Sequence, residues 1–285
     1  MTSRAATLIG LTAILMWSLL SVMTVATGAI PPFQLMAMTF AIGAAASAIA
    51  RPSSLKFEQP WLAFLIGTGG LFGYHALYFV ALRLAPPAEA GLLNYLWPLL
   101  IVLFSSFLPG EKLRVHHMIG ALLGLVGTVL LLAENLTLAA SPAHLAGFAA
   151  ALAAAFVWAG YSVLSRRLQE VPTDAVVRNC MNTAFLAFGV HRFTEEAVWP
   201  SGPLAWAAIV ALGVGPVGAA FIAWDIGMKR GDIRVLGAAS YATPLLSTGF
   251  LILAGFAQAS ANIALAAALI AGGGLIAAKD MIRRR

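Results

Sequence analysis

Large aromatic side chains with polar tips occur at the centre of apolar segments in this chain. Asn94, Tyr95, Trp97 and Pro98 lie in the middle of an apolar run over residues 86–108. Such a run is long enough to cross a bilayer core of roughly 30 Å. Tyr and Trp in membrane spans usually lie at the two interfaces. Placed at mid-membrane, they instead favour a cavity that binds a small, largely apolar or aromatic molecule.

The same pattern occurs a second time in the chain. Residues 239–246 repeat the pattern of residues 93–100, and the two prolines are 146 residues apart. The sequence therefore predicts an internal duplication. Two similar sets of residues are then expected around one centre. Three pairs of central aromatic residues correspond between the halves: Trp17 and Trp158, Tyr78 and Trp224, and Tyr95 and Tyr241.

Pro98 and Pro244 each lack an amide donor, so the carbonyls of Asn94 and Ser240, four residues earlier, are expected to lose their helix partners. We expect these carbonyls to accept from a substrate ammonium group, while nearby side-chain donors meet a carboxylate. The alternatives are simple packing kinks at the prolines and an aromatic core without a ligand. The candidate substrate-binding residues are Trp17, Tyr74, His75, Tyr78, Asn94, Tyr95, Trp97, Pro98, Trp158, Tyr161, Ser162, Trp224, Ser240, Tyr241 and Pro244.

The composition is that of an integral membrane protein. Of the 285 residues, 61% are hydrophobic and only 10% are charged, and the mean hydropathy is +0.90. The net charge of +6 comes from Lys and Arg in short connections, so we predict no nucleic-acid partner. The single cysteine, Cys180, excludes an internal disulfide.

Apolar runs predict an all-α integral membrane protein with about ten transmembrane helices. Two repeats of five spans each, an odd number, must enter the membrane in opposite orientations. We therefore expect two inverted five-helix repeats around a central cavity, at residues 1–138 and 139–285. The predicted spans are 8–28, 31–50, 61–82, 86–108, 115–133, 143–165, 173–191, 203–228, 232–255 and 260–279.

The basic residues predict the orientation of these spans. Of the 17 Lys and Arg residues, only Arg83 and Arg192 fall on one side of the predicted membrane, and Arg178 falls inside a span. The others, among them Lys56 and Arg283–Arg285, share the side of the termini. Because cytoplasmic loops are enriched in Lys and Arg, we expect both termini in the cytoplasm.

Ionisable residues inside the spans are few. His75 could carry a proton or only a hydrogen bond, and Glu89 and Asp225, near span ends, are expected to be solvated or paired. Without a central carboxylate, uniport, exchange or weak coupling is favoured over tight coupling to protons or sodium. The adjacent His116 and His117 are expected in a solvated connection, so we predict no metal site.

Small residues recur on the fifth and tenth spans. Gly120, Gly124 and Gly127 share one span, and Gly272–Gly274 lie on the other. These glycines permit close helix approach. We expect these two spans to pack closely within one chain, so a monomer is favoured over a dimer.

The motifs of an enzyme are missing from this sequence. It contains no His-Glu-x-x-His, cysteine cluster, nucleophile elbow or phosphate-binding loop. A channel, the second alternative, would need a continuous polar or charged lining, whereas the predicted cavity wall is aromatic. A carrier that exposes a midplane site alternately to each side is therefore preferred.

The order of these motifs resembles the drug/metabolite transporter superfamily in its EamA-type branch. The resemblance rests on Trp-Ser in the first span, Trp-Ala-Gly in the sixth, the proline-centred fourth and ninth spans, the turn with Glu111 and the glycine-rich fifth and tenth. Tyr74-His75-Ala-Leu-Tyr78, with Asn94 to Pro98, is similar to the aromatic amino acid exporters of this superfamily. One departure is that residues 255–258 of the second repeat lack an acid matching Glu111.

The resemblance implies export of aromatic and other amino acids, or related metabolites, across the bacterial inner membrane. It implies no cofactor; the partners are a small-molecule substrate and the lipid bilayer. The alternative within the superfamily is an exporter of cationic or lipophilic drugs. By position, the resemblance implies a cavity lined by Trp17, His75, Tyr78, Tyr95, Trp97, Pro98, Trp158, Trp224 and Tyr241.

Overall fold

The computed structural model describes residues 1–55, 58–110, 112–132, 141–255 and 260–280. These residues form helices joined by short connections and contain no strand. The helices are α1 (Ser3–Ser18), α2 (Leu20–Ala26), α3 (Pro32–Ala50), η1 (Pro52–Leu55), α4 (Trp61–Leu84), α5 (Pro87–Asn94), α6 (Trp97–Ser105), α7 (Val115–Leu132), α8 (Pro142–Arg167), α9 (Ala175–Thr194), α10 (Pro203–Leu212), η3 (Gly213–Ala219), α11 (Ala220–Arg230), α12 (Ile233–Ala239), α13 (Ala242–Leu253) and α14 (Ala261–Ala277).

The all-α membrane fold predicted from the apolar runs is confirmed. Among the described residues, eight helical segments are long and apolar enough to cross a membrane, and α14 is a shorter apolar helix. The exception among the predicted spans is α9, which carries Asn179, Asn182 and Arg178 within its 20 residues. The count of ten spans in two inverted repeats remains a prediction.

Four spans are interrupted near their middle. α1 gives way to α2 at Leu19, α5 to α6 at Tyr95, and α12 to α13 at Ser240. The span of α10 and α11 contains a π-helical stretch, η3, around Pro216. Proline is tolerated in the first turn of a helix, which is where Pro98 lies in α6.

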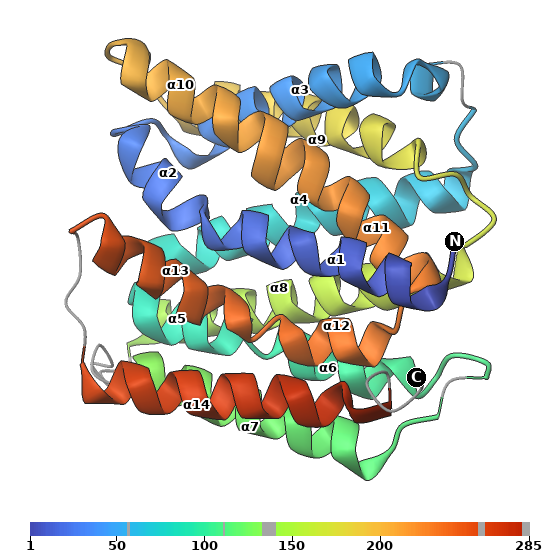
Figure 1. Cartoon of the computed structure of the whole chain (residues 1–285). Coiled ribbons are helices and arrows are strands. Elements are labelled where there is room, and N and C mark those ends of the chain that lie inside the picture. The colour runs from blue at the N-terminus through green and yellow to red at the C-terminus, as the bar shows by residue number, and fades with distance from the viewer. Residues whose placement is uncertain (56–57, 111, 133–140, 256–259, 281–285) are drawn as a thin grey trace.

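The helices lie side by side, and both chain ends are at the same edge of the bundle (Figure 1). α3 packs against α9 at one end of the row, and α7 packs against α14 at the other. A Cβ added at Gly120 would lie 2.5 Å from the Gly273 carbonyl. The predicted close packing within one chain is therefore confirmed at Gly120, Gly124, Gly127 and Gly273, whereas a Cβ at Gly272 or Gly274 would meet nothing within 4 Å.

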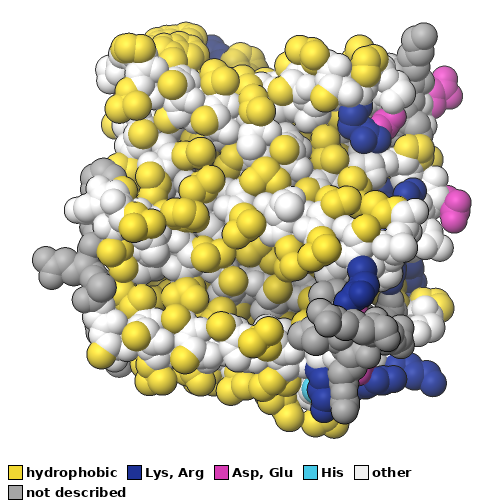
Figure 2. Space-filling model, in the orientation of Figure 1, with side chains coloured by type: hydrophobic (Ala, Val, Ile, Leu, Met, Phe, Trp, Pro, Cys, Tyr) yellow, Lys and Arg dark blue, Asp and Glu magenta, His cyan; other side chains and the backbone are white. Residues whose placement is uncertain are grey.

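Side chains on the outside match this arrangement. The face seen in Figure 2 is mostly hydrophobic, and its Lys and Arg side chains gather toward the edge with both termini. The distribution of Lys and Arg in the sequence predicts that this edge faces the cytoplasm, and that orientation remains a prediction. Lys56, Glu111, residues 256–258, Arg283–Arg285 and the boundary between 138 and 139 lie outside the described residues.

Candidate substrate-binding cavity

A cavity of about 260 Å³ lies among the interrupted helices. This volume is close to the lower end of small-molecule sites, roughly 300 Å³. Its wall includes eight of the predicted residues: Trp17, Tyr74, His75, Tyr78, Asn94, Tyr95, Trp97 and Trp158.

Three indoles form the inner wall of this cavity. The Trp17 and Trp158 ring centroids are 5.5 Å apart in an edge-to-face arrangement, and those of Trp97 and Trp158 are 6.2 Å apart. The ring centroids of Tyr74 and Trp158 are 5.1 Å apart. The Trp17 indole N–H donates to the Pro216 carbonyl at 3.0 Å, which fixes this ring against η3. The wall is therefore aromatic and its geometry is set by few hydrogen bonds.

Asn94 and His75 contribute polar atoms to the same wall. The Asn94 side-chain amide donates to the Tyr74 hydroxyl at 3.1 Å, and its Oδ1 has no partner among the described residues. His75 Nδ1 lies 2.6 Å from the Leu71 carbonyl. Because a carbonyl only accepts, Nδ1 carries the proton, and Nε2 of the neutral ring is an acceptor.

The other predicted residues lie behind this wall or away from it. Trp224 is 1% exposed and donates to the Ser162 hydroxyl at 3.0 Å. Tyr161 packs on Gly70, and Tyr241 packs on Gly124. Two of the three corresponding pairs, Tyr78 with Trp224 and Tyr95 with Tyr241, thus take unequal positions, whereas Trp17 and Trp158 both line the cavity. The predicted residues outside the cavity lining are Pro98, Tyr161, Ser162, Trp224, Ser240, Tyr241 and Pro244.

The expectation for the two proline-freed carbonyls is wrong at Ser240. Its carbonyl accepts from the Thr243 amide at 3.0 Å, so a three-residue hydrogen bond replaces the one that Pro244 cannot make. At Asn94, Pro98 likewise removes the amide four residues on.

Several lining residues were missed by the sequence interpretation. Thr243 and Ser247 are four residues apart and share one face of α13, and Ser247 donates to Ser21 at 2.7 Å. Pro216 was a detectable signal, because it is a third proline at the middle of an apolar span. The missed residues are Leu20, Ser21, Pro216, Val217, Phe221, Thr243 and Ser247.

The cavity faces away from the chain termini. Its exposed members, Leu20 and Ser21, lie beyond the break at Leu19, toward the far end of the first span. On the terminal side, Trp17, Trp97 and Trp158 are each at most 8% exposed. A solute in the cavity is therefore separated from the terminal edge by these indoles.

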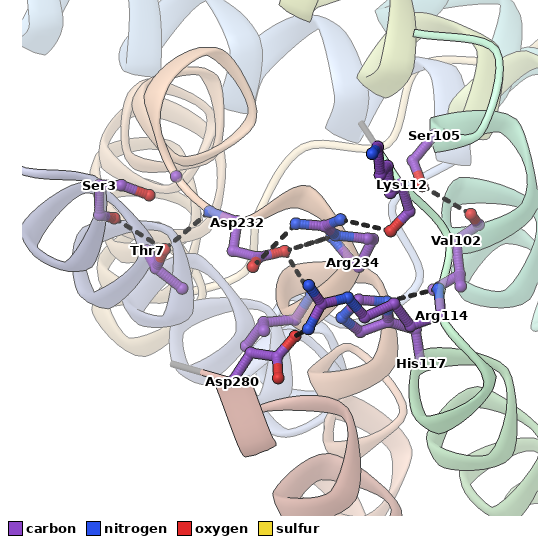
Figure 3. A network of polar contacts seen from close by, with 12 residues as sticks. Ser3, Thr7, Val102, Ser105, Lys112, Arg114, His117, Asp232, Arg234 and Asp280 are labelled. Carbon is purple, nitrogen blue, oxygen red and sulfur yellow. Dashed lines mark hydrogen bonds and ion pairs between the residues drawn. The ribbon is translucent and has the colours of Figure 1, made fainter. Parts of the chain in front are cut away.

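A polar network lies outside these indoles at the terminal edge (Figure 3). Arg234 pairs with the Asp232 carboxylate, with Nε 3.1 Å from Oδ1, and donates to the Lys112 carbonyl at 2.7 Å. The Asp232 amide donates to the Thr7 hydroxyl at 2.8 Å. Burial alone would raise the pKa of Asp232, but hydrogen bonds and charge from Arg234 hold it below its usual value. The network joins α1, α12 and the connection before α7.

Three further contacts lie at the same edge. Asp225 pairs with Lys229 at 3.0 Å, and each side chain is 5% exposed. Lys229 also donates to the Val171 carbonyl at 2.8 Å, and Arg166 donates to the Gly231 carbonyl at 2.9 Å. Asp225 is therefore paired rather than solvated. These bonds join α11 to α8 and to the connection that follows α8.

The two adjacent histidines do not lie in a solvated connection, so that expectation was wrong. α7 begins at Val115, and His117 is 1% exposed. His116, His117 and Asp280 bring ligand atoms within 4.8 Å of one another. However, His117 Nδ1 accepts from the Arg114 amide, which leaves the proton on Nε2 of the neutral ring. Arg114 also pairs with Asp280 at 2.6 Å, so the group is poorly suited to a metal ion.

Comparison with known proteins identifies the family. A model of the EamA-like transporter family matches residues 4–133. The chain is 55% identical to the aromatic amino acid exporter YddG of Ancylobacter novellus, over 97% of this chain and 98% of the relative. It is 26% identical to the Escherichia coli protein of that name, over 97% of each chain. A crystal structure of a 53% identical protein covers 100% of both chains with a TM-score of 0.93. The chain therefore belongs to the EamA-like transporter family.

Proposed function

We propose that this protein exports aromatic amino acids, and related amino acids, from the cytoplasm across a bacterial inner membrane. The observation that carries the proposal is the aromatic cavity bounded by Trp17, Trp97 and Trp158. The relatives that match over nearly their whole length are named as aromatic amino acid exporters. An aromatic side chain packs favourably edge-to-face on such rings. The activity is that of a carrier, without a covalent step.

In this proposal the indoles take the substrate side chain and the polar atoms take its zwitterionic end. The Asn94 carbonyl and Oδ1 accept from the ammonium group. The hydroxyls of Tyr74 and Thr243 donate to the carboxylate. Ser162 and Ser240, which were expected to contribute, act only by holding the structure behind the wall.

Transport proceeds by alternating access to this one cavity. The structure is open away from the termini, so the contacts at the terminal edge must separate before substrate enters from the other side. With both termini in the cytoplasm, the open side is the periplasm. The ten spans and two inverted repeats predicted from the sequence would allow the two halves to exchange conformations.

Counterflow in proteoliposomes tests the function. Unlabelled phenylalanine is loaded inside, and entry of labelled phenylalanine is followed for the wild type, Trp97→Ala and Trp97→Phe. Entry should be accelerated by internal substrate, abolished in Trp97→Ala and partly retained in Trp97→Phe. Trp206→Ala is the matched control, because Trp206 is 42% exposed on α10 and lies outside the cavity. Lack of acceleration for every amino acid would reject the proposal.

A further inference from the structure

We infer that the cavity recognises the ammonium end of its substrate far more strongly than the carboxylate, and that it therefore also carries arylalkylamines, which lack a carboxylate. The inference rests on the proposed function, since it concerns the same cavity. It adds a substrate class: primary amines attached to an aromatic ring by a short alkyl chain. The reasons are the acceptors, the ring faces and the charges of the lining.

The first reason is an unpaired acceptor in the wall. Asn94 is 3% exposed, and one of its two side-chain N–H groups donates to the Tyr74 hydroxyl. Its Oδ1 has no partner among the described residues, and Pro98 removes the amide that would pair with its backbone carbonyl in a regular helix. A buried acceptor without a partner is costly unless a ligand supplies the donor. An ammonium group supplies three donors.

The second reason is the tautomer of His75. The Leu71 carbonyl holds the proton on Nδ1, so Nε2 of the neutral ring presents a lone pair. A neutral His75 in this tautomer cannot donate through Nε2 to a carboxylate. It therefore adds a second acceptor to the residues that line the cavity.

The third reason is the set of ring faces. Trp17, Trp97 and Trp158 surround the inner end, and Tyr74 and Tyr78 stack with centroids 6.1 Å apart. The face of an aromatic ring carries a negative quadrupole, which attracts a cation within about 6 Å. Trp17 has its N–H engaged by Pro216, so it offers the ligand its ring rather than a donor.

The fourth reason is the charge of the lining. The described residues that line the cavity include no Lys, Arg, Asp or Glu. A carboxylate therefore meets neutral donors alone, and the hydroxyls of Ser21 and Ser247 are already bonded to each other. Since charge-assisted pairs with Arg or Lys are the strong contacts of a carboxylate, its removal from the substrate should weaken binding little.

Binding of three matched ligands tests the inference. Calorimetry on the purified protein in nanodiscs at pH 7 compares phenylalanine, phenethylamine and 3-phenylpropionate. The Kd of phenethylamine should lie within tenfold of the Kd of phenylalanine. The Kd of 3-phenylpropionate should be at least tenfold higher than that of phenethylamine. Phenethylamine loaded into proteoliposomes should also accelerate entry of labelled phenylalanine. The inference is overturned if 3-phenylpropionate binds as well as phenethylamine, or if phenethylamine fails to bind or to accelerate entry.

A charge variant gives a second readout. Asn94→Asp should raise the affinity for phenethylamine relative to phenylalanine at least tenfold, because the new carboxylate attracts the ammonium and repels the substrate carboxylate. Asn182→Asp, on α9 outside the cavity, should leave that ratio unchanged. If phenylalanine exchange works while phenethylamine is inert, the inference alone fails. If phenylalanine is not exchanged by folded protein, the proposed function fails first.

Discussion

The indole N–H of Trp17 donates a hydrogen bond to the Pro216 carbonyl at 3.0 Å, linking residues 199 positions apart in sequence. The bond is possible because η3 departs from α-helical pairing. The Ala220 amide bonds the carbonyls of Gly215 and Val217, which leaves the Pro216 carbonyl between them for Trp17. The hydrogen bond thus joins two interrupted spans, α1–α2 and α10–α11, at one wall of the cavity.

Replacing Trp17 by Phe should separate ring packing from this bond. Trp17→Phe keeps an aromatic ring but removes this buried hydrogen bond, at a cost of about 0.5–1.5 kcal/mol. We expect a lower midpoint of thermal unfolding and a roughly tenfold lower kcat/KM for phenylalanine counterflow. Trp206→Phe, on the lipid-facing surface, serves as control. Unchanged stability and transport in Trp17→Phe would show that the bond has no role.

The two central prolines should differ in their effect on transport. Pro98→Ala restores an amide that can pair with the Asn94 carbonyl and so removes an acceptor from the cavity. The Ser240 carbonyl already accepts from Thr243, so Pro244→Ala removes none. We expect KM for phenylalanine to rise at least threefold in Pro98→Ala and less than twofold in Pro244→Ala, measured by initial rates of uptake. Equal effects would contradict the assignment.

Two adjacent glycines on α4 should respond oppositely to the same substitution. A Cβ at Gly70 would lie 2.6 Å from the Tyr161 side chain, whereas a Cβ at Gly69 meets nothing within 4 Å. Gly70→Ala should therefore destabilise the fold by about 1–3 kcal/mol through overpacking. Gly69→Ala should be neutral or stabilise it by up to about 1 kcal/mol, since Ala is the better helix former. Thermal unfolding in detergent measures both, and a stable Gly70→Ala protein would disprove the close packing.

The sequence was sufficient for the fold and for half of the cavity wall, for a physical reason. Apolar runs of bilayer length can only be helices in lipid, so the positions of α3, α4 and α8 followed from composition. Tyr74, Tyr78 and Asn94 were found because polar-tipped residues at mid-span are unusual.

The rest of the wall depended on tertiary packing. Repeat symmetry suggested equal roles for Tyr95 and Tyr241, but Tyr241 is 0% exposed and packs on Gly124. Matching residues therefore have different neighbours, which the sequence alone does not reveal. Ser21 and Ser247 carry ordinary polar groups, and only the fold brings them together.

Acid should destabilise the protein partly through Asp174, which precedes α9. Burial would raise the pKa of Asp174, but hydrogen bonds from Ser53 and Arg51 and the Arg51 charge hold it below its usual value. Its contribution to stability is therefore complete above the unfolded pKa of about 3.9 and is lost as the pH falls through the folded value. Asp174→Asn should lower the unfolding temperature at pH 7, and its difference from the wild type should shrink as the pH falls from 7 through the folded pKa. A constant difference across that range would contradict this origin.

The Arg234 network should hold the terminal edge closed. Arg234 joins Asp232 to the Lys112 carbonyl, and Ile233 beside it is 0% exposed. In a Cys180→Ala background, a maleimide should label Ile233→Cys slowly. Adding Arg234→Ala should speed labelling roughly tenfold, since charge-assisted bonds of about 1.5–3 kcal/mol are lost.

Arg114→Ala is the matched control for that experiment. Arg114 pairs with Asp280 at the same edge, but the two side chains are 54% and 29% exposed. Exposed ion pairs contribute about 0–1 kcal/mol, so labelling of Ile233→Cys should change less than threefold. Phenylalanine binding must persist in each variant, which shows that the protein is folded. Equal labelling with and without Arg234 would mean that the buried indoles alone close this side.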